Sequence, residues 1–292
     1  MSYNPINYND MKKILIVAMD FSEGAMNAFN FAIRVANAIN ANIMMVWVDK
    51  KKIGSSVYSN AFDPRLEVKK RFEELIKKYS DRLKSGKFLY KMRNGKVHIE
   101  ITNQAKYHDA TLILAGTHGT SGLDEFWMGS NAQRIVANAE CPVITMRHDE
   151  DYNKSINKIL LPIDSTRETR QKLPFTTSLA KCLGAEITIL SLYTSQVQSI
   201  RDFVNEYSNQ AKDYIIERDV ECTLEVIEAK NITDSTLEYA KENDIDLITI
   251  MTEQESSPMN LLLGPYAQQM VNHSPIPVLS IRRKSIYDHQ TK

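Results

Sequence analysis

The sequence predicts an α/β fold that is built twice, each half being a five-stranded parallel sheet with helices on both faces. Short apolar runs rich in β-forming residues alternate with longer segments whose apolar residues recur at helical spacing, a pattern typical of parallel sheets. The second half of the chain then repeats the pattern of the first. The 292 residues correspond to about two domains of ordinary size.

Five strands are expected in the first half, at residues 12–19, 43–48, 87–92, 111–115 and 143–147. Helical spacing follows the first strand, and a second helix is expected after Pro64, because proline suits the first turn of a helix. Residues 96–107 are also expected to be helical. Their β-branched residues are poor helix formers, so a hairpin strand is the local alternative.

Three pairs of segments carry the internal duplication. KILLPID at 158–164 repeats KILIVAMD at 13–20, AKCLGAEITIL at 180–190 aligns with residues 36–46, and YAQQMVNHSPIPVLSIR at 266–282 aligns with residues 131–147. The second half should therefore have strands near residues 158–162, 186–192, 222–227, 246–251 and 278–282. The expected organisation is a first domain, a polar linker, a second domain and a tail, at residues 1–147, 148–156, 157–284 and 285–292.

Composition indicates a globular protein with a substantial core. Hydrophobic residues make up 43% of the chain, and 36 basic residues balance 36 acidic ones. A global basic field for nucleic acid or anionic membranes is therefore excluded, and any anionic partner is expected to be small and locally bound. The scattered cysteines Cys141, Cys182 and Cys222 indicate reduced thiols that act as small buried hydrophobic residues. No signal-peptide core or membrane-spanning apolar run is visible, so a cytoplasmic protein is expected.

Residues 111–130 have the order strand, glycine-rich segment, helix. Glycines follow the strand at positions 116, 119 and 129, and the helix begins after Ser130. The N–H groups at a helix N-terminus suit a phosphate, and glycines allow close approach of a ligand or positive φ. Three turn glycines in an ordinary connection are the alternative, since the segment lacks the Gly-Lys-Ser or Gly-Lys-Thr of the common phosphate loop.

The glycine-rich segment resembles the nucleotide-binding signature of universal stress proteins: GTHG, nine residues, GS, and then a helix and a Cys-Pro-Val strand. This resemblance implies two tandem Rossmann-like domains of the HUP superfamily, each with strand order 3-2-1-4-5. It also implies ATP or another adenine nucleotide, with or without Mg²⁺. The residues expected to bind it are Ala18, Asp20, Val48, Ala115, Gly116, His118, Gly119, Gly129, Ser130 and Asn131.

In the implied order, the first and fourth strands are neighbours at the switch point, where open α/β sheets bind ligands. Asp20 ends the first strand and Gly116 ends the fourth, so two separate features meet there. Asp20 is expected to contact ribose hydroxyls or adenine, and a helix cap is its simpler role. His118 has no second base beside it in the motif, so it is interpreted as a phosphate neighbour or a surface residue and not as a catalytic group.

The second half lacks most of the residues that are expected to hold phosphate in the first half. The counterparts of Gly116, Gly119 and Ser130 are, in that order, Met251, Gln254 and Pro265. Proline removes a backbone donor, and Glu253 and Glu255 place negative charge where phosphate would lie. Only one nucleotide per chain is therefore expected, in the first half.

A regulatory module of the stress response, whose nucleotide state is read by a partner protein, is the leading functional hypothesis. A slow ATPase or another adenine-nucleotide enzyme is the second, and a ligand-free interaction scaffold is the third. No dedicated catalytic base is recognisable, so at most weak ATP hydrolysis is expected. Both copies end in an apolar strand after a proline, so the halves are expected to pair antiparallel through residues 143–147 and 278–282. A homodimer of two chains is left open.

Overall fold

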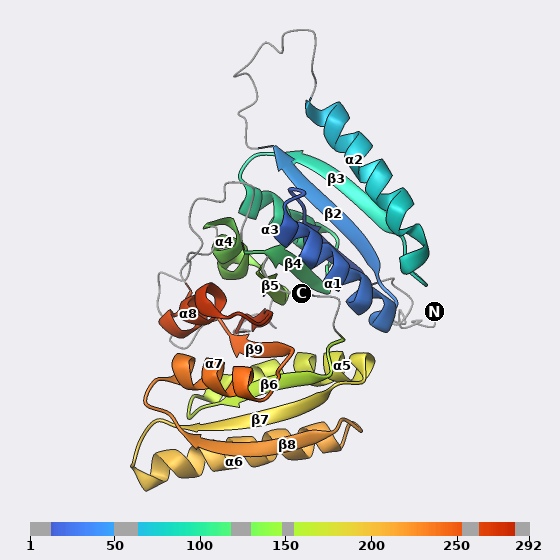
Figure 1. Cartoon of the computed structure of the whole chain (residues 1–292). Helices are drawn as coiled ribbons and strands as arrows, with labels where there is room; N and C mark the ends of the chain where they lie inside the picture. The colour runs from blue at the N-terminus through green and yellow to red at the C-terminus, as the bar shows by residue number, and fades with distance from the viewer. Residues whose placement is uncertain (1–12, 50–63, 118–129, 148–154, 253–262, 284–292) are drawn as a thin grey trace, which may run out of the picture.

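The structure is a computed structural model that describes residues 13–49, 64–117, 130–147, 155–252 and 263–283. Within these residues the chain forms two α/β halves that share one sheet (Figure 1). Several expectations fall outside the described residues: the roles of His118, Gly119, Gly129, Glu253, Gln254 and Glu255, most of the linker at 148–156, and the tail at 285–292.

The first half alternates strands and helices as expected, and residues 97–107 are helical. Its elements are β1 (Ile14–Ala18), α1 (Glu23–Ile39), β2 (Asn42–Asp49), α2 (Pro64–Tyr79), β3 (Phe88–Asn94), α3 (Val97–Tyr107), β4 (Leu112–Gly116), α4 (Ser130–Asn138) and β5 (Val143–Met146). A short 3-10 helix, Ser80–Arg82, follows α2.

The second half repeats this order of strands and α-helices, but the short 3-10 helices of the two halves lie at different places. A 3-10 helix, Arg167–Lys172, precedes the helix α5. The elements are β6 (Lys158–Ile163), α5 (Leu173–Leu183), β7 (Glu186–Tyr193), α6 (Gln198–Ile216), β8 (Cys222–Glu228), α7 (Ile232–Glu242), β9 (Leu247–Met251), α8 (Pro265–His273) and β10 (Val278–Ile281).

The ten strands of the described residues form one sheet in the order β3-β2-β1-β4-β5-β10-β9-β6-β7-β8. Each half therefore has the order 3-2-1-4-5, and its strands are parallel, as expected. The halves join through β5 and β10, which are antiparallel with Ile144 opposite Leu279. The expected pairing of the two final strands is confirmed.

Two layers of helices cover this sheet, and each layer spans both halves. Buried side chains of α1, α2, α5 and α6 share one core cluster with one face of the strands. Those of α3, α4, α7 and α8 form a second cluster on the opposite face. A hydrogen bond from Gln133 Nε2 to Asn272 Oδ1, 2.7 Å long, links α4 to α8 across the junction of the halves.

Local sequence signals set the helix ends. Ser22 caps the N-terminus of α1, and Asn231 caps that of α7 by accepting from the N–H groups of Thr233 and Asp234. The first helix of each half ends in a left-handed residue, Asn40 with φ 56° and Gly184 with φ 68°. These two residues are counterparts in the repeat, so the duplication extends to backbone conformation.

The expectation for the cysteines is partly wrong. Cys182 is exposed on α5, whereas Cys141 and Cys222 are half-buried. Burial raises the pKa of the Cys141 thiol to about 12, so this thiol is protonated near neutral pH. No helix in the described part of the chain is long and apolar enough to cross a membrane.

We expect Leu279→Ala to lower the free energy of unfolding by about 2–5 kcal/mol, because it removes a fully buried side chain at the junction of the halves. Val226→Ala, on the end strand β8 where the side chain is 45% exposed, should cost about 0.5 kcal/mol or less. Urea denaturation of the whole chain measures both. Equal costs would contradict a structural role for the junction.

Candidate functional site

The two halves have equivalent switch points beyond the carboxyl ends of their first and fourth strands. The strand β1 lies between β2 and β4, as β6 lies between β7 and β9. The registers also correspond, since Ala18 is opposite Val46 and its counterpart Pro162 is opposite Leu190. Because the chain leaves the carboxyl end of β4 and returns through α4 to the start of β5, the N-terminus of α4 lies on the switch-point side.

Asp20 is placed by a tight turn that precedes α1. Its Oδ1 accepts hydrogen bonds from the Ser22 backbone N–H, at 3.0 Å, and from the Ser22 hydroxyl. Ser22 in turn caps α1 by accepting from the Ala25 N–H at 3.3 Å. The simpler role of supporting a helix start is therefore present, but the Asp20 side chain is exposed, and its Oδ2 accepts no hydrogen bond from the described residues.

Gly116 has a packing role that differs from the one expected of it. A Cβ atom at this position would lie 2.5 Å from the carbonyl carbon of Gly24 and 2.9 Å from the Ala25 nitrogen. Gly116 is not among the described residues whose φ angle is positive. The glycine is thus needed because the N-terminus of α1 lies against the end of β4, whether or not a ligand is present.

Three other expected residues gather on one face of the strand ends. Ala18, Val48 and Ala115 all pack in the core cluster that contains α3 and α4. Ala18 is half-buried, whereas Val48 and Ala115 are buried, so Ala115 could offer a ligand only its backbone. Ser130 is the first residue of α4, and Asn131 follows it with a half-buried side chain.

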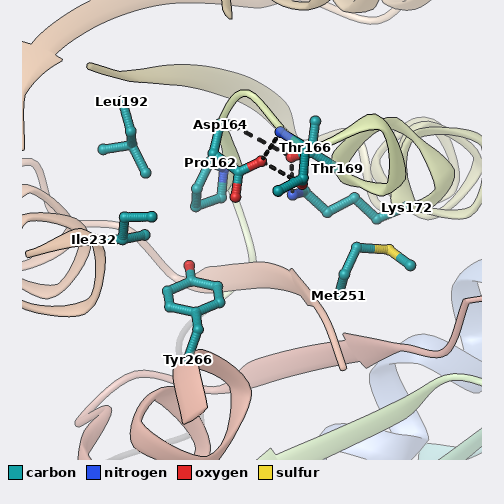
Figure 2. A pocket seen from close by; sticks show the side chains of 9 residues that line it. All are labelled: Pro162, Asp164, Thr166, Thr169, Lys172, Leu192, Ile232, Met251 and Tyr266. Carbon is teal, nitrogen blue, oxygen red and sulfur yellow. Dashed lines mark hydrogen bonds between the residues drawn. The ribbon is translucent and has the colours of Figure 1, made fainter. Parts of the chain in front are cut away.

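In the second half a small cavity occupies the switch point (Figure 2). Its lining includes the counterparts of Ala18, Asp20, Val48 and Gly116, which are Pro162, Asp164, Leu192 and Met251. The cavity volume is about 10 Å³. Because this volume is near the least that holds one water molecule, the described arrangement has no room for an adenine nucleotide.

Asp164 keeps the turn that Asp20 makes in the first half. Its Oδ1 accepts from the Thr166 N–H at 2.9 Å and from the Thr166 hydroxyl at 2.5 Å, and its backbone N–H donates to Thr169 Oγ1 at 3.4 Å. Unlike Asp20, Asp164 is buried, with 9% of its surface exposed. The duplicated turn therefore places one carboxylate in solvent and the other in the cavity wall.

Lys172 is a cavity residue that was not among the expected site residues. It is only 4% exposed, and its Nζ donates to Thr169 Oγ1 at 3.1 Å. Burial lowers the pKa of this amine to about 8, although the negative charge of Asp164 raises it. Alignment of the repeats places Lys172 opposite the fully buried Ala28, and this contrast is the signal that could have revealed it.

Tyr266, on the first turn of α8, brings a further polar group to the cavity. Its hydroxyl is buried and makes no hydrogen bond of normal geometry with the described residues. The nearby Thr236 hydroxyl donates to the Ile232 carbonyl at 2.6 Å. Burial raises the pKa of Tyr266, Thr236 lowers it in part, and Asp164 raises it further, so the phenol is neutral.

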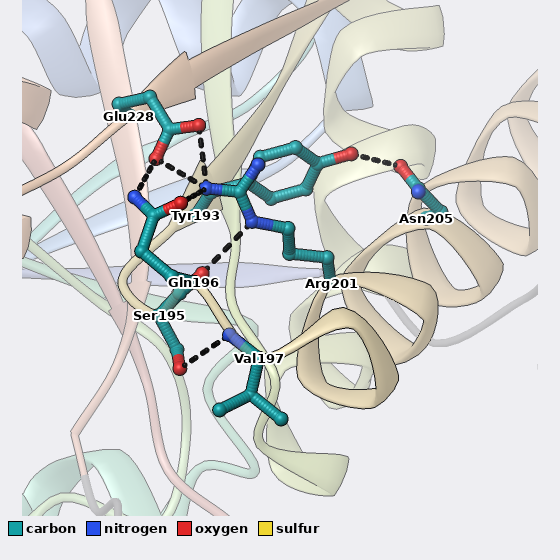
Figure 3. Close-up of polar contacts among 7 residues, drawn as sticks. All are labelled: Tyr193, Ser195, Gln196, Val197, Arg201, Asn205 and Glu228. Carbon is teal, nitrogen blue, oxygen red and sulfur yellow. Dashed lines mark hydrogen bonds and ion pairs between the residues drawn. The ribbon is translucent and has the colours of Figure 1, made fainter.

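Arg201 forms a separate polar network at the ends of β7 and β8 (Figure 3). It contacts Glu228 Oε1 at 2.7 Å, donates from Nε to the Ser195 carbonyl at 2.9 Å, and lies over the Tyr193 ring at 4.9 Å. Because its charge is already paired with a carboxylate, we assign Arg201 a structural role at this edge. No group of three or more potential metal-ligating side chains occurs within the described ranges.

The chain is similar to universal stress proteins in sequence and in structure. The model of the universal stress protein family matches residues 11–147 and 155–282. The universal stress protein YxiE of Bacillus subtilis is 28% identical over 146 residues, which are 46% of this chain and 97% of the relative. A putative universal stress protein of Staphylococcus epidermidis is 31% identical over 149 residues, covering 47% of this chain and 86% of its own.

A solved structure extends this likeness to both halves together. The crystal structure of a universal stress protein from Archaeoglobus fulgidus matches 93% of this chain and 97% of its own, with a TM-score of 0.73 and 16% identity. At this identity the match supports the fold alone. The two sequence relatives above are about half as long as this chain, so each matches one half of its length.

We expect Gly116→Ala to destabilise the protein by about 1–3 kcal/mol, because the new Cβ would overlap the backbone of α1. At the counterpart in the second half, Met251→Leu conserves volume and should cost less than about 1.5 kcal/mol. Thermal unfolding compares the two. A neutral Gly116→Ala would show that β4 and α1 are not packed as described.

Proposed function

Because the chain belongs to the universal stress protein family, we propose that its first half binds an adenine nucleotide at the switch point between β1 and β4. The observation that carries the proposal is the exposed Asp20 carboxylate, whose Oδ2 accepts no hydrogen bond from the described residues and lies where strand order reverses. Carboxylate oxygens accept hydrogen bonds well from ribose hydroxyls, so the residue fits this ligand.

The surrounding residues suit the parts of a nucleotide. The half-buried Ala18 would offer apolar surface for adenine, and the buried Val48 packs in the core cluster on the same face of the sheet. The N-terminus of α4, with Ser130 and Asn131, would hold phosphate through backbone N–H groups. Gly119, Gly129 and His118 belong to the same proposed site. A Mg²⁺ ion, where one accompanies the phosphates, would supply positive charge to them.

Nucleotide binding in this proposal serves regulation and not turnover. The residues of the first half would bind and orient the nucleotide, and the state of residues 116–130 would be read by a partner protein in the cytoplasm. The second half would stabilise the first through β5 and β10, and its own switch point holds only a small cavity lined in part by Met251 and Lys172. A steady-state ATP hydrolysis assay tests the proposal of a regulatory role. Sustained ATP turnover that is lost in Asp20→Asn would favour an enzyme.

We expect calorimetry to give one ATP per chain. Gly119→Leu should abolish binding, because a bulky side chain would replace the close approach of backbone to phosphate, whereas Gly264→Ala in the second half should barely change affinity. Circular dichroism checks that both variants fold. A stoichiometry of two, or ATP binding that survives Gly119→Leu, would contradict the proposed site.

The repeat supplies a matched pair of variants for the carboxylate. Loss of a charge-assisted hydrogen bond costs about 1.5–3 kcal/mol, so Asp20→Asn should weaken ATP binding by about 10- to 150-fold. Asp164→Asn, the same change at the buried counterpart, should leave the affinity for ATP unaltered. Equal losses in the two variants would place the nucleotide elsewhere.

A further inference from the structure

The two ends of the ten-stranded sheet carry opposite charge. The basic end is formed by α2 and β3, residues 64–94, in which 11 basic residues outnumber 4 acidic ones. The acidic end is formed by the equivalent elements of the second half, α6 and β8, residues 198–228, in which 8 acidic residues outnumber 3 basic ones. The two segments lie at opposite ends of the molecule (Figure 1). A chain with no net charge is therefore strongly polarised along its sheet.

Each end strand has one edge that pairs with no other described strand, since β3 pairs only with β2 and β8 only with β7. The Lys87 carbonyl and the Gly95 N–H bind β2, so the backbone groups of alternate residues between them face outward. Glu221 and Ala229 bind β7 in the same way. The outward-facing residues are Phe88, Tyr90, Met92 and Asn94 in β3, and Cys222, Leu224, Val226 and Glu228 in β8.

The direction of the end strands determines how copies of the chain could join end to end. Strands within each half are parallel, and the halves join antiparallel, so β3 and β8 run in opposite directions. A second copy that continues the sheet with the same face outward would therefore place its β8 antiparallel to β3 of the first. Because α2 and α6 belong to the same helical layer, the basic α2 would then lie beside the acidic α6.

We propose that copies of this chain join head to tail, with β3 of one copy paired antiparallel to β8 of the next. The central residues of these seven-residue strands are Lys91 and Glu225. Both are exposed, and neither makes an ion pair with another described residue. When the two strands are centred on each other, these side chains lie directly opposite on one face of the sheet. Opposite charges in such a cross-strand pair stabilise the pairing.

The same register fits the backbone and the apolar residues of both strands. Outward-facing residues of β3 meet outward-facing residues of β8, so each such pair can exchange two backbone hydrogen bonds. A shift by one residue would lose this match. Val226, which is 45% exposed, would be covered by the neighbouring copy. The opposing apolar pairs are Tyr90 with Val226, Met92 with Leu224, and Leu89 with Ile227.

The charge on the end strands selects between the possible contacts. Charged side chains usually keep the edges of sheets apart, but this protection does not apply where the two edges carry opposite charge. The strands are also longer than the four-residue strands that join the halves within the chain. Each contact leaves one free end on each copy, so the contact can repeat beyond a dimer.

Sedimentation velocity of the full chain at increasing protein concentration tests the proposal. At low ionic strength we expect species larger than a dimer, and added salt should return them to the monomer, because it screens the exposed charges. A chain that stays monomeric at about 100 μM, whether or not its basic end binds DNA, would overturn the proposal. Association that stops at a dimer would indicate a symmetric contact and would also overturn it.

Reversal of the central charges tests the register. Lys91→Glu and Glu225→Lys should each weaken the association about tenfold, because each places like charges opposite one another. An equimolar mixture of the two variants should associate again, since each contact then joins a glutamate to a lysine. Lys241→Glu, on α7 outside both end strands, changes the net charge as Lys91→Glu does and should have no effect. A loss in only one of the two end-strand variants would indicate contact between like ends and refute the head-to-tail arrangement.

A proline at an outward-facing position separates strand pairing from a purely electrostatic contact. The Val226 N–H faces away from β7, so Val226→Pro removes a donor to the neighbouring copy and leaves the hydrogen bonds to β7 in place. The variant should abolish association while the chain stays folded by circular dichroism. Val226→Thr keeps the N–H and the β-branched shape, so it should weaken association less than about threefold. Association that survives Val226→Pro would rule out the pairing of β3 with β8.

Discussion

The antiparallel pairing of β5 with β10 is the interaction on which the rest of the structure depends. In either half alone, the fifth strand would end the sheet with unpaired backbone groups along an apolar segment. Joined, the two strands complete a ten-stranded sheet, and each helical layer becomes continuous across the junction. The four-residue length of each strand is enough because helices from both halves pack around them.

The two halves of the duplicated chain share the same order of strands and α-helices but differ at their switch points. The aspartate turn and the left-handed end of the first helix occur in both copies. At the end of the fourth strand, however, glycine in one copy corresponds to methionine in the other, and a buried alanine corresponds to Lys172. A charged group in that position opposes stability by desolvation, so packing alone gives no reason for it.

Much of the fold could be predicted because its signals are local. Buried parallel strands are continuous apolar runs, and those of both halves lie within a few residues of the expected ranges. The helix at 97–107 contains poor helix formers, but burial of Ile101 against the sheet outweighs their propensity. Strand order could be expected only from the family resemblance, since several orders satisfy the same alternation.

The site was less predictable, because its decisive features depend on packing between distant segments. The reason for Gly116 is the backbone of α1 against β4, which no local pattern reveals. The burial of Lys172 could be read only by comparing the repeats, because lysines on helices are usually exposed. Asp20 and Asp164 form equivalent turns in the two halves but differ in burial. That difference arises from the neighbouring side chains.

The shared sheet also determines which strands lie at its ends, where they can contact other molecules. With β5 and β10 joined internally, the sheet ends at β3 on one side and β8 on the other. Exposed positions of β3 include the cation Lys91, and those of β8 include the anion Glu225, whereas Arg93 and Glu228 are paired within the chain with Glu100 and Arg201. Two copies that met by the same end would bring like charges together, so growth of the sheet by symmetric end-to-end contact is opposed electrostatically.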